Sequence, residues 1–200
     1  MRIIGGTAAN TFLKAPKGLN VRPTPDLVRQ AIFNSLGPRV EGARVLELFG
    51  GTGALSLESL SRGARSALCV ELSTKHARFI ESNARACGLP VGSLSLRVDD
   101  VFHALPRLKE QGQRFDLILA DPPFGEKNVN RRSESLSQKL LDDEHLPFLL
   151  DEDGLFILGH TKRDQLALTP AWDERKHMKH GDSQMLFLAL SLPTPAGDGV

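Results

Sequence analysis

From residue 43 onward, short apolar runs alternate with longer amphipathic segments, and this alternation constrains the fold more than any other feature. The apolar runs have the length of buried strands and cover 44–49, 67–70, 93–98, 115–120, 154–158 and 185–192. The segments between the first five runs carry apolar residues at helical spacing and cover 54–61, 74–87, 101–108 and 133–150. Strands that alternate with helices predict an α/β fold with a doubly wound parallel sheet, whose ligands bind beyond the C-terminal ends of the strands.

The first 40 residues depart from this pattern. Residues 2–6 and 11–13 predict two short strands around a turn, and 27–36 predicts a helix with Thr24 or Asp26 as its N-cap. We therefore expect an N-terminal hairpin-and-helix appendage (1–40) that faces the substrate, a main domain (41–192) and a frayed tail (193–200).

The composition is that of one globular domain, with 200 residues of which 40% are hydrophobic and 24% charged. The two cysteines, Cys69 and Cys87, lie in apolar or helical stretches, and the histidines show no metal-ligand spacing. This pattern argues against disulfides and against a metal site, and it fits a reducing compartment. No apolar run approaches the ~18 residues of a membrane span. We expect a cytoplasmic protein without a membrane partner.

The positive charges are concentrated near the N-terminus. Residues 1–44 carry seven Lys and Arg residues against two acids, although the whole chain has a net charge of only +1. A basic end on a mildly acidic body suits contact with a polyanion. A solvated face explains the same charges equally well.

The first strand of the main domain ends in a glycine-rich turn, Gly50-Gly51-Thr52-Gly53. Glycines let the backbone approach a ligand closely, and the following helix N-terminus offers N–H groups. The spacing lacks the third glycine of the dinucleotide motif, which disfavours a nicotinamide oxidoreductase. Glu71 closes the second strand, and Asp99 and Asp100 close the third, so acids surround the turn. This arrangement suits a nucleoside, because a strand-terminal acid can hold ribose hydroxyls.

The fourth strand ends in the most specific motif, Asp121-Pro122-Pro123-Phe124. Consecutive prolines fix the backbone and leave carbonyls without local partners, so the corner can accept hydrogen bonds from an –NH2 group. The aromatic ring of Phe124 offers a face on which a base can stack. A ring-attached amine is a poor nucleophile, and acceptors that orient it and stabilise its developing positive charge favour attack on a methyl donor.

Together these features resemble the class I methyltransferases that modify exocyclic amines of nucleic-acid bases. More narrowly, the chain resembles the RsmD family of small-subunit ribosomal RNA guanine-N2 methyltransferases. The motifs that carry this resemblance are Arg2-Ile3-Ile4-Gly5-Gly6, Arg22-Pro23-Thr24, Val28-Arg29, Phe33-Asn34, Leu48-Phe49, Gly51-Thr52-Gly53-Ala54-Leu55, Glu58, Leu60-Ser61-Arg62-Gly63-Ala64 and Gly181-Asp182. The chain departs from the family at residues 7–11, where a basic stretch is usual, and at Gly159-His160, where an acid before the histidine is usual.

The resemblance implies a Rossmann-like, seven-stranded, mostly parallel sheet with a terminal antiparallel strand, and S-adenosylmethionine as the donor without a metal. It implies that Glu71 holds the ribose, Asp100 the adenine amine, and residues 121–124 (Asp121, Pro122, Pro123, Phe124) the target guanine. Further donor contacts would come from the strand ends around the turn: Glu47, Phe49, Gly51, Thr52, Gly53, Leu72, Val101 and Asp121. The partner would be ribosomal RNA, naked or within a small-subunit particle, bound by a monomer. Its candidate RNA contacts are Lys14, Lys17, Arg22, Thr24 and Arg29, with the basic stretch 127–132 as the next candidate.

Two alternatives remain open at this point. The same acceptor corner would also orient the amine of adenine in DNA or RNA, or a free amine. A donor-binding assembly factor without turnover is a different class, and the intact Asp121 corner speaks against it.

Overall fold

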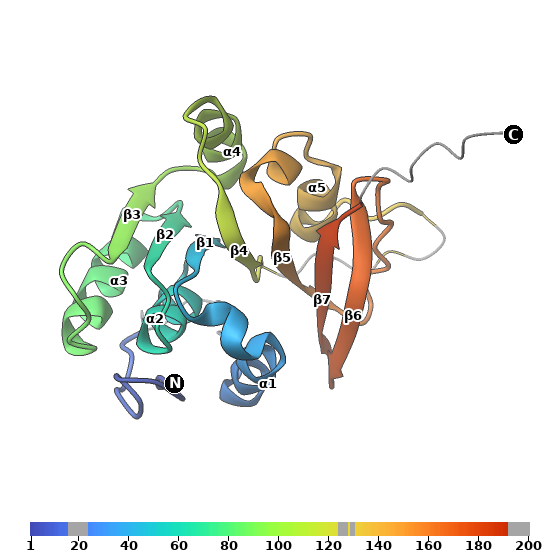
Figure 1. The fold of residues 1–200 in the computed structure, drawn as a ribbon. Helices are drawn as coiled ribbons and strands as arrows, with labels where there is room; N and C mark the ends of the chain where they lie inside the picture. Colours follow the sequence, from blue (N-terminus) through green and yellow to red (C-terminus); the bar gives the residue numbers. More distant parts are fainter. Residues whose placement is uncertain (16–23, 124–127, 129–130, 192–200) are drawn as a thin grey trace, which may run out of the picture.

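The computed structural model describes residues 1–15, 24–123, 128 and 131–191 (Figure 1). A seven-stranded sheet runs through the molecule in the order β3-β2-β1-β4-β5-β7-β6. The strands are β1 (Arg44–Leu48), β2 (Ser66–Glu71), β3 (Leu94–Val98), β4 (Phe115–Ala120), β5 (Leu150–Thr161), β6 (Trp172–His180) and β7 (Ser183–Leu190). Strands β1 to β5 are parallel, whereas β7 runs antiparallel to β5 and β6 antiparallel to β7. The expected doubly wound, Rossmann-like sheet with an antiparallel edge is confirmed.

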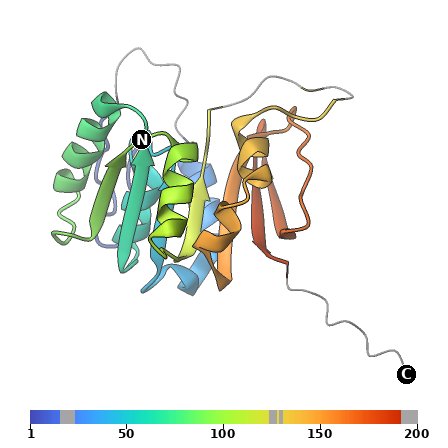
Figure 2. The same cartoon turned by 90° about the horizontal axis from the view of Figure 1, so that it is seen from above.

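Helices cover both faces of this sheet (Figure 2). They are α1 (Asp26–Leu36), α2 (Ala54–Ser61), α3 (Thr74–Ala86), α4 (Val101–Glu110) and α5 (Leu136–Asp142), with short 3-10 turns at Gly37–Val40 and Leu146–Leu149. Buried side chains of α1 and α2 pack on one face of the sheet, and those of α4 and α5 pack on the other. Among the helices of the described ranges, none is both long enough and apolar enough to cross a membrane.

Three expectations about local structure were wrong. The predicted helix 133–150 is only the seven-residue α5, because the chain turns at Asp143, whose carboxylate accepts hydrogen bonds from the N–H groups of His145 and Leu146. Strand β6 was not recognised, because this edge strand carries mostly exposed charged side chains in place of an apolar run. The residue before α1 is Pro25, so neither Thr24 nor Asp26 is its N-cap. The predicted tail 193–200 lies outside the described residues.

The N-terminal segment packs against the back of α2. Its two expected strands are reduced to one antiparallel bridge between Arg2 and Phe12. The buried carboxylate of Glu58 accepts hydrogen bonds from the N–H groups of Ile4 and Gly5, at 2.8 and 2.9 Å. Buried apolar side chains of the N-terminal segment, Ile3, Ala8 and Leu13, form a cluster with Ala54 and Leu57 of α2 and with Cys87, which follows α3. The N-terminal segment is therefore fixed against α2, outside the sheet.

Candidate active site

The strand register brings the predicted site residues to one edge of the sheet. Leu48 at the end of β1 pairs with Val70 of β2 on one side and with Ala120 of β4 on the other. The residues that follow these positions, the glycine turn, Glu71 and Asp121, therefore lie at the carboxyl edge of the same three neighbouring strands (Figure 1). This is where ligands bind in doubly wound folds.

The glycine turn is a tight backbone feature that requires glycine. Gly53 has a φ of 74°, and a Cβ there would lie 2.8 Å from a methyl carbon of Ile80 in α3. Its N–H donates to the Gly50 carbonyl at 2.7 Å, which closes the turn before α2 begins. Thr52 is buried, and its carbonyl accepts a hydrogen bond from Asn83 of α3 at 3.0 Å. The turn is thus held between α2 and α3.

Glu47 lies beneath this turn with only 2% of its surface exposed. Its two carboxylate oxygens accept hydrogen bonds from the N–H groups of Leu55 (3.3 Å) and Ser56 (3.0 Å) in the first turn of α2. Two of the N–H groups expected to be free at this helix N-terminus are therefore occupied by the protein itself. Burial raises the pKa of Glu47 to about 7, against the lowering effect of these hydrogen bonds. Glu47 therefore supports the start of α2 from inside the protein, and its burial does not fit a direct contact with the methyl donor.

Glu71 links the glycine turn to the start of α3. Its Oε2 accepts from the Gly51 N–H at 2.7 Å, and its Oε1 accepts from the Ser73 N–H at 2.8 Å. The His76 Nδ1 atom lies 3.1 Å from the same Oε1. A carboxylate has about four acceptor positions, so this network leaves Glu71 capacity for a ligand hydroxyl. Sequence reasoning missed the contact with His76, although a histidine five residues after an acid at a helix start was a signal.

The third strand end supplies another rigid boundary. Asp100 caps α4, because its carboxylate accepts a hydrogen bond from the Phe102 N–H at 2.8 Å. Val101 is buried, whereas Leu72 after β2 is 68% exposed. The ring of Phe49, in a backbone conformation with φ of 60°, meets the Phe102 ring edge-on at a centroid distance of 6.3 Å. Leu72 and Asp100 follow β2 and β3, which neighbour β1 at this edge of the sheet, and an adenine contact of Asp100 remains a proposal.

Asp121 lies at the end of β4 and is partly buried. Its Oδ2 accepts a hydrogen bond from the hydroxyl of Thr24, which precedes α1. Burial raises the pKa of Asp121, and the hydrogen bond from Thr24 opposes this shift. No hydrogen bond between described residues ends on the carbonyl of buried Pro122 or exposed Pro123. Phe124 lies outside the described residues.

Gly159 of β5 forms the wall on the other side of Asp121. A Cβ atom at position 159 would overlap with Asp121 Oδ1. The Gly159 carbonyl accepts a hydrogen bond from the hydroxyl of buried Ser137 at 2.9 Å, which fixes the strand there. In this chain, a side chain at position 159 would therefore have to displace the Asp121 carboxylate.

The candidate RNA-binding cations differ in their exposure and in their partners. Lys14 is exposed, and its backbone is held by Asn83 through hydrogen bonds of 2.8 and 3.0 Å. Arg29 is fully buried, so the expectation that it contacts RNA phosphates was wrong. Lys17 and Arg22 lie outside the described residues. In the basic stretch after the Pro-Pro corner, the exposed Arg132 pairs with Asp142 at 2.6 Å.

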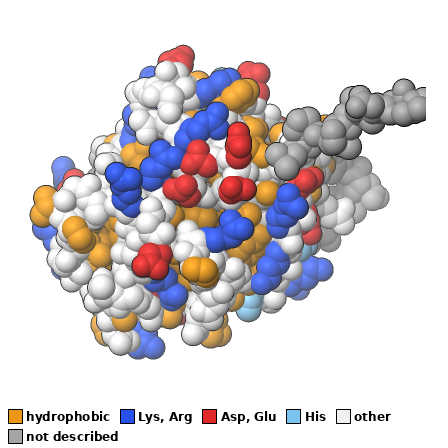
Figure 3. Space-filling model, viewed as in Figure 1, with side chains coloured by type: hydrophobic (Ala, Val, Ile, Leu, Met, Phe, Trp, Pro, Cys, Tyr) orange, Lys and Arg blue, Asp and Glu red, His pale blue; other side chains and the backbone are white. Residues whose placement is uncertain are grey.

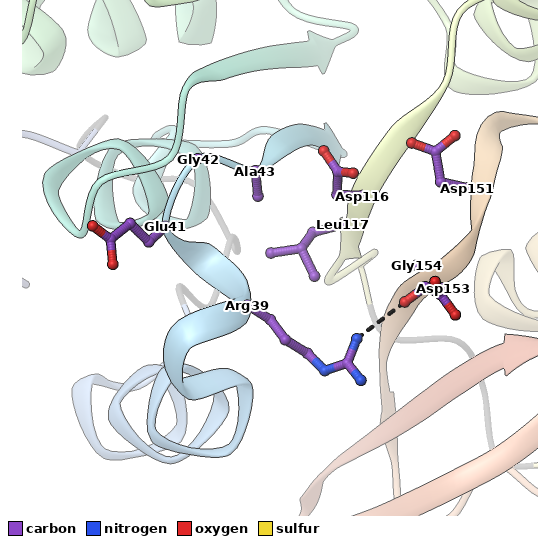
Figure 4. A pocket seen from close by; sticks show the side chains of 9 residues that line it. All are labelled: Arg39, Glu41, Gly42, Ala43, Asp116, Leu117, Asp151, Asp153 and Gly154. Carbon is purple, nitrogen blue, oxygen red and sulfur yellow. Dashed lines mark hydrogen bonds between the residues drawn. The ribbon is translucent and has the colours of Figure 1, made fainter.

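A separate cavity of about 310 Å³ lies at the opposite edge of the sheet, near the starts of β1, β4 and β5 (Figure 4). Arg39 reaches across it and donates to the Asp153 carbonyl at 3.0 Å. Its lining includes four acids: Glu41, Asp116, Asp151 and Asp153. Figure 3 shows acidic side chains gathered there between basic ones, over the starts of β4 and β5. This cavity is remote from the strand ends that carry Glu71 and Asp121, and its acidic lining does not suit RNA.

Comparison with known proteins gives consistent matches along the chain. The family model described as Conserved hypothetical protein 95 matches residues 1–189. The protein YlbH of Bacillus subtilis is 33% identical over 169 residues, which is 84% of this chain and 87% of that protein. Ribosomal RNA small subunit methyltransferase D of Haemophilus influenzae is 33% identical over 172 residues, covering 85% of this chain and 83% of that protein. The solved structure of Thermus thermophilus protein TTHA0928 has 29% identity and a TM-score of 0.76, covering 95% of this chain and 99% of that chain.

Proposed function

The chain belongs to the family described as Conserved hypothetical protein 95, the RsmD family of ribosomal RNA methyltransferases, and from this premise we propose that it methylates the exocyclic N2 amine of a guanine in small-subunit ribosomal RNA. The methyl donor is S-adenosylmethionine. The observation that carries the proposal is the Asp121-Pro122-Pro123 corner, which stands one strand away from the glycine turn at the same edge of the sheet.

The corner provides the acceptors that an amine nucleophile needs. The Asp121 carboxylate and the proline carbonyls can accept both protons of an –NH2 group, which orients its nitrogen. Positive charge develops on this nitrogen during attack, so the carboxylate contact strengthens in the transition state. When bound, the sulfonium donor supplies an activated methyl group. The amine nitrogen would form its N–C bond as the donor's S–CH3 bond breaks, the electron pair of that bond would remain on sulfur, and the proton released by the nitrogen would pass to solvent.

The donor side of the site is formed by the turn and the two acids that follow β2 and β3. Glu71 retains acceptor capacity for ribose hydroxyls, and Asp100, at the end of β3, is the acceptor that we assign to the adenine amine. Leu72, exposed beside Glu71, offers an apolar surface for the adenine ring. These roles fit the chemistry of a nucleoside donor.

Nucleoside analysis of ribosomal RNA tests the function directly. RNA from a strain that lacks the protein should lack one N2-methylguanine in the small subunit, and the purified protein with S-adenosylmethionine should restore it. Loss of N6-methyladenine would overturn the guanine assignment, and unchanged RNA would overturn the function. Asp121→Asn should abolish restoration, whereas Asp173→Asn, on a carboxylate that is 52% exposed on β6, should not.

A further inference from the structure

The hydrogen bond from Thr24 to Asp121 joins the N-terminal segment to the proposed catalytic carboxylate across 97 residues of sequence. Thr24 does not cap α1, although it stands two residues before the helix. Its hydroxyl is directed instead to Oδ2 of Asp121. A hydroxyl has a single proton to donate, so its orientation here is committed to this carboxylate.

Thr24 is itself held by a buried cation. The guanidinium of Arg29, with no exposed surface, donates to the Thr24 carbonyl at 3.0 Å and to the Asp26 carboxylate at 3.0 Å. The same guanidinium donates to the carbonyl of Arg2. Hydrogen bonds from a charged donor are stronger than those between neutral groups, and removing this buried cation would leave its carbonyl partners unsatisfied. The backbone at Thr24 is therefore fixed by strong interactions.

The carboxylate of Asp121 is therefore confined from two sides. Thr24 binds Oδ2, and the bare backbone of Gly159 lies against Oδ1. We propose that Thr24 is a positioning residue for methyl transfer, whose hydroxyl fixes the rotation of the Asp121 carboxylate and keeps it as an acceptor for the target amine. This inference rests on the proposed function of Asp121 and goes beyond it. It assigns Thr24, a candidate RNA contact on sequence grounds, the role of positioning the catalytic carboxylate.

Two physical effects follow from this hydrogen bond. A hydroxyl donor stabilises the ionised carboxylate and so opposes the effect of burial on its pKa. It also removes a rotational freedom that the transition state would otherwise have to restrict. Both effects act on turnover and leave the donor site around Glu71 untouched.

The test compares Thr24→Val, which keeps the shape without the hydroxyl, with Thr24→Ser, which keeps the hydroxyl. We expect Thr24→Val to lower kcat roughly tenfold, the loss of about one charge-assisted hydrogen bond. The KM for RNA and the affinity for S-adenosylhomocysteine should stay within twofold of wild type. The acid limb of the kcat–pH profile should move to higher pH, because the carboxylate loses a donor that favours its ionised form. Thr24→Ser should recover most of kcat, and Thr7→Val, a hydroxyl loss on the back of α2, should change neither kcat nor the profile.

A readout without turnover separates this inference from the proposed function. Carbon-13 NMR titration of Asp121 in the free protein should show a higher pKa in Thr24→Val than in wild type or Thr24→Ser. An unchanged Asp121 pKa, or a Thr24→Val variant with normal kcat and a raised KM for RNA, would overturn the positioning role. A wild-type protein that methylates no ribosomal RNA while the Asp121 pKa still shifts would overturn the proposed function alone.

Discussion

Glu71 accepts a hydrogen bond from the backbone N–H of Gly51 at 2.7 Å, so the acid that ends β2 holds the turn that follows β1. Its other oxygen binds the N–H of Ser73 just before α3. One carboxylate therefore fixes two loops that border the same ligand space. Any ribose hydroxyl that binds Glu71 meets a group whose position is already set, which lowers the ordering cost of binding.

Replacing Glu71 should weaken donor binding in a measurable way. We expect Glu71→Ala to reduce the affinity for S-adenosylmethionine and S-adenosylhomocysteine by one to two decades, from the loss of roughly 1.5–3 kcal/mol of charge-assisted hydrogen bonding. Titration calorimetry measures this change. The matched control is Glu81→Ala, on an exposed acid of the same helix that Glu71 precedes. Equal affinities of Glu71→Ala and wild type would remove Glu71 from the donor site.

A side chain at position 159 should displace Asp121. Gly159→Ala should lower kcat at least tenfold, because the added Cβ overlaps with Asp121 Oδ1, while donor affinity stays within twofold. Gly154→Ala in the same strand is the control, since its Cβ would meet Leu150 at 2.7 Å, far from the site. That control should lose about 1–3 kcal/mol of stability and keep the kcat of the folded protein. A fully active Gly159→Ala enzyme would show that the Asp121 carboxylate need not occupy this position.

Glu47 should make stability depend on pH in the neutral range. Its folded-state pKa of about 7 lies above the ordinary value of 4.5, so the folded state binds the proton more tightly than the unfolded state. The stabilisation is complete below pH 4.5 and is lost as pH rises to about 7, with a total on the order of 3 kcal/mol. Glu47→Gln should remove this component, so the difference in unfolding free energy between wild type and variant should change between pH 5 and pH 8. Urea unfolding at both pH values measures it, and parallel pH profiles would contradict the prediction.

The salt dependence of RNA binding tests Lys14, the candidate RNA-binding cation that is both described and exposed near the N-terminus. If Lys14 contacts a phosphate, Lys14→Gln should reduce the slope of log affinity against log salt by roughly 0.7. Binding of small-subunit RNA across a salt series provides the measurement. Lys75→Gln is a control on an exposed cation of α3. An unchanged slope would make the N-terminal basic residue a solvated side chain and direct attention to the stretch 127–132.

The alternation of apolar runs and amphipathic segments determined most of the fold, because burial on both faces of a parallel sheet leaves a strong hydrophobic signal. The boundaries of β4 and the start of α3 were predicted to the residue. Strand β6 left no such signal, since it lies at the edge of the sheet, where β7 is its one partner among the described strands. The sequence also placed the acids and the Asp-Pro-Pro motif at strand ends, which is a local property of each strand.

Tertiary structure alone decided what each side chain does there. Arg29 and Lys14 have the same charge and the same basic neighbourhood in the sequence, yet one is fully buried and the other exposed. Glu47 lies near the end of β1 and Glu71 ends β2, both beside the turn. The Glu47 carboxylate, however, accepts its hydrogen bonds from N–H groups of the α2 N-terminus. The contact between Thr24 and Asp121, and the need for glycine at 159, arise from elements brought together only on folding. Their sequence separation hides them from local patterns, because local periodicity reports burial and not the partner that a buried polar group finds.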